Sequence, residues 1–155
     1  MGSGTRDVVV VLGEDSGAIA EAIDGMPVKT AYNREPWSAM AESVRLGLRE
    51  IDAASTGVLV CLSDHPLVSS ETVRSLVNVH AEHPGGIIIP LYQGRRGHPT
   101  LFPRIFIQDM FNEMTLRDVI TSHTDKVRML DVDDEGVVLD LDTPEDYERA
   151  KACFS

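Results

Sequence analysis

The sequence predicts an α/β fold with helices on both faces of a largely parallel sheet. Short β-branched runs alternate along the chain with stretches whose apolar residues recur at helical spacing, a pattern typical of strands joined by crossover helices. The run at residues 57–62 (GVLVCL) is apolar throughout, as expected for an interior strand that helices cover on both sides. Together these observations favour a sheet between two helical layers.

The size and composition of the chain fit a single domain over residues 1–155. Its residues are 43% hydrophobic, and a chain of this length buries about two-thirds of its unfolded surface in one core. The sequence contains no repeat and no linker. Residues 1–4 (MGSG) have the composition of a flexible or expression-derived lead-in, so they are left out of the fold prediction.

The net charge and the positions of the cysteines argue against nucleic-acid binding, membrane binding and a zinc site. A formal net charge of −11 repels nucleic acid and anionic membranes, so an anionic ligand needs a metal ion, clustered arginines or a helix N-terminus. The two cysteines, Cys61 and Cys153, lie far apart and show no zinc-site spacing. Since no signal peptide or membrane span is evident, we expect a soluble cytoplasmic protein.

The strands and helices in the first 62 residues are predicted from local periodicity. The strands are rich in β-branched residues, and the second helix places Met40, Val44, Leu48 and Ile51 on one face. In order, these elements are a strand at 7–12, a helix at 16–23, a strand at 28–31, a helix at 38–51 and a strand at 57–62.

The second half of the chain continues the alternation and ends in a strongly marked helix. The expected elements are a helix capped by Ser69 or Ser70 that runs to about residue 80, a strand at 86–90, a glycine-rich basic segment at 92–102, helices at 105–111 and 116–123, and strands at 127–132 and 137–141. In the last helix, Thr143 is the N-cap, Pro144 is the first helical residue and Asp146 is the third.

Two aspartates that come after predicted strands are candidate metal ligands. Asp64 lies in the turn after residues 57–62, and Asp142 comes after residues 137–141. Ligands of open α/β sheets bind beyond the carboxyl ends of strands, and Mg²⁺ is typically held by one or two carboxylates and substrate phosphates. We therefore expect Asp64 and Asp142 to hold Mg²⁺ and a nucleoside triphosphate. Purely structural roles in a turn and a helix cap are the alternative.

A basic segment in this acidic chain is the candidate anion-binding loop. It consists of Gly94, Arg95, Arg96, Gly97, His98 and Pro99. Arginine binds phosphate with two parallel hydrogen bonds, and glycine lets the backbone approach closely. A hairpin with a solvated basic tip is the alternative. The chain shows no nucleophile elbow and no Walker A lysine loop, so covalent catalysis is not predicted.

Three motifs in order carry a family resemblance. They are Leu-x-Asp-x-Pro at residues 62–66, Gly-x-x-Gly-His-Pro at 94–99 and Asp-x-Asp-Thr-Pro-Glu-Asp-Tyr at 140–147. A weaker likeness runs from Asn33 through Trp37 to Ser43, Arg45 and Gly47. With these motifs the chain resembles the molybdenum cofactor cytidylyltransferases and guanylyltransferases, which have the MobA-like NTP transferase fold.

The resemblance implies a fold, a reaction and site residues. The fold is a three-layer sandwich with a mostly parallel central sheet, like that of nucleotide-diphospho-sugar transferases. The reaction transfers CMP or GMP from CTP or GTP to molybdopterin and releases pyrophosphate. By this resemblance Asp64 and Asp142 bind Mg²⁺ and act in catalysis, Met40 and Ser43 lie at the base and ribose, and Gly94, Arg95, Arg96, Gly97 and His98 bind the pterin phosphate.

Two departures from the family pattern shape further expectations. The family's first strand and its Gly-rich phosphate loop have no counterpart in this sequence, whose strand at 7–12 resembles the family's second, so the resemblance implies that the first βα unit is missing. Residues 113–117 (EMTLR) replace the family's Gly-Asp-x-Gly-Ala-Arg stretch. We therefore expect unpaired strand edges or a gap in the sheet, and a homodimer that completes it. The alternative function is a non-catalytic pterin-binding, nucleotide-binding or scaffold protein, and a third is transfer to a sugar or alcohol phosphate.

Overall fold

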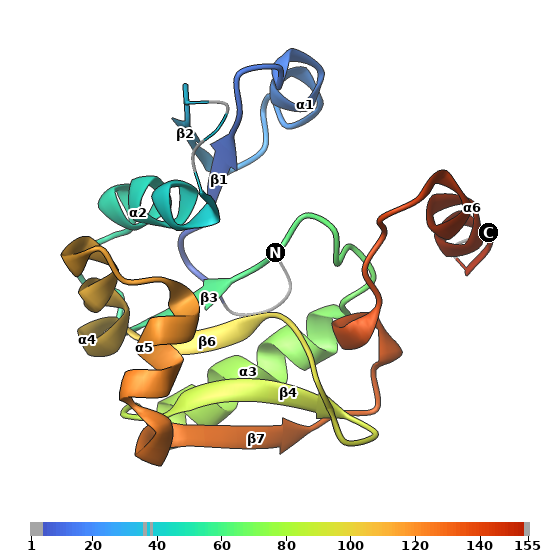
Figure 1. The fold of residues 1–155 in the computed structure, drawn as a ribbon. Helices are drawn as coiled ribbons and strands as arrows, with labels where there is room; N and C mark the ends of the chain where they lie inside the picture. Colours follow the sequence, from blue (N-terminus) through green and yellow to red (C-terminus); the bar gives the residue numbers. More distant parts are fainter. Residues whose placement is uncertain (1–4, 36, 38, 154–155) are drawn as a thin grey trace.

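The structure is a computed structural model that describes residues 5–35, 37 and 39–153. The expected lead-in at residues 1–4 and the expected helix start at residue 38 lie outside these residues. Within the described part of the chain the strands form a five-stranded sheet and a two-stranded sheet (Figure 1). The helices and 3₁₀ turns are α1 (Gly17–Ala22), α2 (Met40–Glu50), α3 (Ser70–Glu82), α4 (Arg104–Ile107), η1 (Gln108–Asn112), α5 (Leu116–Ser122), η2 (Thr124–Lys126), η3 (Glu135–Val138) and α6 (Pro144–Cys153).

The larger sheet mixes strand directions. Its path is β3 (Gly57–Val60), β6 (Thr100–Pro103), β4 (Ile87–Tyr92) and β5 (Arg95–Arg96), with β7 (Val127–Asp131) paired to β4. The contacts along the path are antiparallel, whereas β4 and β7 are parallel. Consequently β3, β4 and β7 share one direction, and β6 and β5 run against them.

Alternate residues of β4 bury the two faces of this sheet. Ile87 and Ile89 pack with Phe102 in a core cluster on the side of α2, α4 and α5. Ile88 packs on the other face with Leu76 of α3. Figure 1 shows α3 behind the sheet and α5 in front of it. This arrangement confirms the expected sandwich of a sheet between helical layers, because both faces of β4 are buried.

The two-stranded sheet pairs β1 (Val9–Leu12) in parallel with β2 (Lys29–Tyr32). Helix α2 joins it to the rest of the protein. A Cβ atom at Gly47 would lie 3.2 Å from Val11 Cγ2, so the backbone of α2 approaches β1 closely. Val44 and Leu48 of the same helix pack against the core cluster of the larger sheet. Among the described residues, β1 pairs only with β2 and β3 only with β6. The unpaired strand edges expected from the sequence are therefore present in this part of the chain, and the two sheets share α2.

One expectation from the sequence is wrong, and two short strands were not predicted. Residues 137–141 do not form a strand, because Glu135–Val138 adopt a 3₁₀ turn that starts with the Asp134 side chain accepting a hydrogen bond from Gly136 N. The segment at 92–102, for which no strand was specified, contains strand β5 and most of β6. Periodicity missed β6 since it is four residues long and buried at every position, so it shows no alternation of apolar and polar side chains.

No helix in the described part of the chain is both long and apolar enough to cross a membrane.

Candidate functional site

Asp64 lies in the turn after β3, where the sequence predicts it. Its backbone carbonyl accepts a hydrogen bond from Leu141 N at 2.8 Å, which brings the residue before Asp142 against this turn. Asp64 is half-buried and Asp142 is exposed. The two candidate metal ligands therefore lie near one another, although Asp142 comes after an irregular segment and not a strand.

Electrostatic repulsion links these carboxylates. The pKa of Asp142 is raised by the charge of Asp140, by partial desolvation and by a hydrogen bond to Asp140, with smaller contributions from Asp64 and Asp146. A divalent cation relieves such repulsion, because it supplies the opposite charge at short range. The acidic group thus has the electrostatic character of a cation site.

The donor set fits a hard cation that retains open positions. Within the described residues, no three His, Cys, Asp or Glu side chains are grouped to hold a metal ion. A pair such as Asp64 and Asp142 is the number of protein ligands that Mg²⁺ normally takes when water and phosphate oxygens complete its octahedron. The residues present therefore fit a metal that binds together with a phosphate ligand.

His98 joins this group from the loop between β5 and β6. Its backbone N–H donates to Val137 O at 2.8 Å, and its ring centroid lies 4.9 Å from that of His65. Burial and the neighbouring His65 lower the pKa of His98, against a smaller opposing effect of Asp64. His98 therefore favours the neutral imidazole, which donates one hydrogen bond and accepts another.

Gly97 permits this close packing. A Cβ atom there would overlap the Val137 carbonyl oxygen and side chain, so no larger residue fits without moving η3. Gly136 is packed equally tightly against the Leu67 carbonyl. The loop that carries His98, turn η3 and the segment after Asp64 are thereby held in mutual contact.

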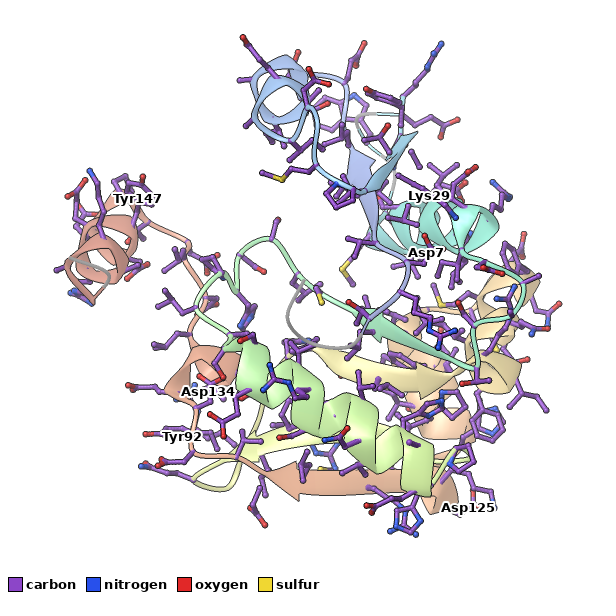
Figure 2. All side chains as sticks on the ribbon, turned by 180° about the vertical axis from the view of Figure 1, so that it is seen from behind. Asp7, Lys29, Tyr92, Asp125, Asp134 and Tyr147 are labelled. Atoms are coloured by element: carbon purple, nitrogen blue, oxygen red, sulfur yellow. The ribbon has the colours of Figure 1, made fainter. Side chains whose placement is uncertain are left out.

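Asp134 ties the same segments together with its carboxylate. It accepts hydrogen bonds from Thr72 Oγ1 at 2.6 Å, Ser69 N at 2.9 Å and Gly136 N at 3.0 Å. Figure 2 shows Asp134 between the start of α3 and the η3 segment. The N-terminus of α3, also capped by Ser69, is therefore fixed against turn η3.

The arginines of the basic segment lie apart from its histidine. Gln93 and Gly94 both have positive φ, 48° and 79°, as a two-residue type I′ hairpin requires. Arg95 and Arg96 then form the exposed strand β5. The hairpin that the sequence offered as the alternative is therefore present. The chain then turns at Gly97, and the His98 ring lies near His65, next to Asp64. Whether the arginines bind an anion stays a prediction.

A hollow lies at the carboxyl ends of β1 and β2. It has a volume of about 320 Å³ and is lined by Val11, Leu12, Gly13, Glu14, Asp15, Asn33, Glu35 and Ser43. Asn33 is buried, donates to Ser43 Oγ at 3.0 Å and accepts from Glu35 N at 3.1 Å. These hydrogen bonds hold the β2 loop against α2 and shape the wall of the hollow.

Both residues predicted to contact the nucleotide lie in the first turn of α2, three positions apart. Ser43 lines the hollow, and Met40 is 57% exposed. Whether they bind a nucleotide stays a prediction. Arg45 links α2 to turn η1, because it forms a salt bridge with Glu42 at 2.9 Å and donates a hydrogen bond to Met110 O at 3.1 Å. The sequence did not identify the loop from Gly13 to Asp15 as part of a site. Its position directly after a predicted strand could have indicated this, because ligands of open α/β sheets bind beyond the carboxyl ends of strands.

Comparison with known proteins identifies the family and the fold. The family description "MobA-like NTP transferase domain" matches residues 2–127. The crystal structure of Rv0371c from Mycobacterium tuberculosis H37Rv shares 28% identity with a TM-score of 0.74, over 96% of this chain and 77% of that chain. Its complex with manganese shares 27% identity with a TM-score of 0.73, over 96% of this chain and 79% of that chain.

Two further structures share the fold at lower identity. The nucleotidyl transferase Mth528 from Methanothermobacter thermautotroptrophicus has 19% identity and a TM-score of 0.78, over 99% of this chain and 75% of that chain. A CMP:2-keto-3-deoxy-manno-octonic acid synthetase complexed with CTP has 10% identity and a TM-score of 0.75, over 98% of this chain and 82% of that chain.

Proposed function

The chain belongs to the MobA-like NTP transferase family, and from this we propose that it is a Mg²⁺-dependent nucleotidyltransferase of molybdenum cofactor biosynthesis. It would transfer CMP or GMP from CTP or GTP to molybdopterin and release pyrophosphate. The observation that carries the proposal is the convergence of Asp64, Asp142 and His98 through the hydrogen bonds from Leu141 N to Asp64 O and from His98 N to Val137 O.

Similar proteins support the proposal that this chain binds a divalent metal and a nucleotide. One relative is described in complex with manganese, and a protein of the same fold is described in complex with CTP. In this chain Asp64 and Asp142 would hold the divalent cation, for which we propose Mg²⁺. The cation would neutralise phosphate charge and orient the α-phosphate.

The residues of the chain would act mainly by positioning. An oxygen of the acceptor phosphate attacks the α-phosphorus, a new P–O bond forms, and the bond to the bridging oxygen breaks as pyrophosphate leaves. The hollow at Ser43 and Asn33 would hold base and ribose, with Met40 at its approach. Gly94, Arg95, Arg96, Gly97 and His98 would receive the acceptor phosphate. No covalent nucleophile is required, because phosphoryl transfer is catalysed by alignment and charge stabilisation.

Pyrophosphate release tests the proposal. The chain is incubated with Mg²⁺, molybdopterin and either CTP or GTP, and we expect pyrophosphate with one of them. Asp64→Asn and Asp142→Asn should each lower kcat about 10²-fold or more, as expected for loss of a charge that acts on the transition state. Asp133→Asn is the matched control, since Asp133 is exposed and has no role in the site.

Three results would count against the proposal. They are a folded chain that releases no pyrophosphate, full activity of Asp64→Asn, and an equal loss in Asp133→Asn. Binding of molybdopterin without turnover in calorimetry would support a non-catalytic pterin-binding protein.

Three further expectations belong to this proposal. Residues 1–155 would act as one domain in the cytoplasm, and the chain would form a homodimer. The mass of the folded protein in light scattering checks the dimer, and a monomeric mass at working concentration would remove it.

A further inference from the structure

His65, the residue after Asp64, has no role in the proposed function, and one nitrogen of its imidazole ring is buried without a partner. This nitrogen, Nδ1, is excluded from solvent and makes no hydrogen bond with any described residue. The other nitrogen, Nε2, has no hydrogen-bond partner in the described part of the chain either, but it is not buried and reaches solvent. Buried polar atoms are nearly always paired, so this arrangement needs an explanation.

Burial decides which nitrogen of His65 carries the proton. A neutral imidazole has one N–H donor and one acceptor lone pair. Buried donors without an acceptor are rarer in folded proteins than buried acceptors without a donor, because a buried unpaired N–H loses its hydrogen bond to water. The proton therefore belongs on Nε2, and the ring presents an Nε2–H donor to solvent.

His80 shows the same arrangement with its donor satisfied. Its Nδ1 is likewise buried without a partner, while its Nε2 lies 3.1 Å from Thr56 Oγ1. With the proton on Nε2, His80 donates to the Thr56 hydroxyl. His65 differs because no described residue accepts from its Nε2, so this donor is free for a ligand.

The backbone on both sides of His65 is held in place. The Asp64 carbonyl accepts a hydrogen bond from Leu141 N at 2.8 Å, and Gly136 packs closely against the Leu67 carbonyl. Figure 1 shows the segment after β3 meeting the segment that leads to α6, near the start of α3. A donor on a fixed turn binds a ligand with little loss of conformational entropy.

His98 places a second imidazole beside this donor. The ring centroids of His65 and His98 lie 4.9 Å apart, and the ring planes are tilted by 56°. The His98 backbone is fixed as well, because its N–H donates to Val137 O and Gly97 N donates to Pro90 O. Hydrogen bonds from N–H to oxygen are about 2.9 Å long, so two oxygens of one phosphate group can accept from both rings. We call the rings of His65 and His98 the histidine pair.

Uncharged donors are well suited to bind a phosphate beside Asp64. The exposed Arg95 and Arg96 form β5, apart from the histidine pair. A cation held by Asp64 and Asp142 would supply the charge that attracts the phosphate, and the imidazoles would supply directional hydrogen bonds. The two contributions are complementary, because hydrogen bonds orient a group that the cation only attracts.

We propose that His65 binds the acceptor phosphate together with His98, by donating a hydrogen bond from Nε2 to one of its non-bridging oxygens. His98 donates to a second oxygen of the same group. A phosphomonoester has a third such oxygen, which stays free to attack the α-phosphorus. That the bound group is the acceptor rests on the proposed function, whereas the histidine pair as a phosphate site rests on the geometry of the two rings.

The tautomer of His65 tests the premise of this proposal. Long-range ¹H–¹⁵N correlation of the ring nitrogens in the full chain distinguishes a protonated from an unprotonated Nδ1. We expect the Nε2–H tautomer for both His65 and His80. An Nδ1–H tautomer of His65 in the folded chain would overturn the proposal, because the donor would then be buried.

Inorganic phosphate, added with Mg²⁺ and without nucleotide, tests the binding. We expect saturable shifts of the ring resonances of His65 and His98. His65→Asn should weaken phosphate binding about tenfold, as expected for a lost hydrogen bond to a charged group, because the asparagine amide lies at the position of Nδ1. His65→Gln, whose amide extends to the position of Nε2, should retain most of the affinity.

His83→Asn is the matched control for these variants, since His83 is exposed at the other end of α3. It should bind phosphate like wild type, and the amide spectrum of each variant reports whether it is folded. Wild-type affinity in folded His65→Asn would overturn the proposal, and so would equal losses in the asparagine and glutamine variants of His65.

Steady-state kinetics separates this inference from the proposed function. In an active chain, His65→Asn should raise the KM for molybdopterin about tenfold and leave kcat and the KM for the nucleotide within about twofold, because the lost bond holds only the acceptor. An unchanged KM for molybdopterin would overturn the role of His65 and leave the reaction intact. If the wild-type chain releases no pyrophosphate and phosphate binding still depends on His65, the histidine pair stands and the proposed reaction is wrong.

Discussion

Single residues decide how the site is held, and Asp134 shows this most clearly. Its carboxylate joins the N-terminus of α3 to turn η3 through three hydrogen bonds. Partial burial alone would raise the pKa of Asp134, but the hydrogen bonds from Thr72, Ser69 and Gly136 outweigh burial and lower it. The folded protein therefore favours the charged form of this side chain.

We expect Asp134→Asn to lower the free energy of unfolding by about 1–3 kcal/mol, because charged hydrogen bonds are lost. Since the pKa is lowered on folding, this stabilisation is complete above the ordinary aspartate pKa of about 3.9 and is lost as the pH falls through the folded value. Urea unfolding at several pH values checks this. The variant should lose less stability than wild type on acidification, and Asp133→Asn should behave like wild type. Equal acid sensitivity of all three proteins would contradict the assignment.

At the scale of elements, two helices begin with the same capping box and contribute differently to stability. Thr115 and Asp118 cap α5, and Thr143 and Asp146 make the matching hydrogen bonds at α6. Helix α5 buries Val119 in the main core cluster. Helix α6 lies apart from the sheets at the end of an extended segment, where Figure 2 shows Tyr147.

Thr115→Ala should therefore lower the free energy of unfolding by about 1 kcal/mol, the usual cost of an N-cap. Thr143→Ala should instead increase amide exchange within α6 and change the unfolding midpoint little, because α6 opens locally. Denaturant unfolding and amide exchange distinguish the two outcomes. A larger loss of global stability from Thr143→Ala would mean that α6 is part of the cooperative core.

At the scale of the whole molecule, stability is expected to be uneven between the two sheets. β4 is buried at its first four positions and lies between β6 and β7. β2 is mostly exposed, and its only partner in the described part of the chain is β1. The smaller sheet relies on α2, whose backbone meets Val11 at Gly47.

We therefore expect the paired amides of Val10 and Leu12 to exchange faster than those of Ile88 and Ile89. Local opening needs less free energy where few apolar contacts are broken. Exchange measured by NMR on the chain alone checks this order. Equal rates at the two sets of amides would show that both sheets open only with global unfolding.

The sequence by itself determined the features that depend on neighbouring residues. Ser69 and Thr143 begin their helices as predicted, the apolar run before Asp64 forms β3, and helix boundaries fall within a few residues of expectation. Capping and periodicity are local interactions, so they can be read from adjacent positions. Asp64 could be selected as a site residue for the same reason.

Only the tertiary structure decided which distant segments meet. Leu141 lies far from Asp64 in the sequence, yet its backbone N–H donates a hydrogen bond to the Asp64 carbonyl. Gly97 and Gly136 permit close contacts that the sequence pattern does not predict. The strand predicted at residues 137–141 does not form, because Glu135–Val138 adopt a 3₁₀ turn. The open edges of β1 and β3 likewise depend on which strands find partners. These features arise from long-range packing and hydrogen bonding, whose free energies outweigh local propensity where the two disagree.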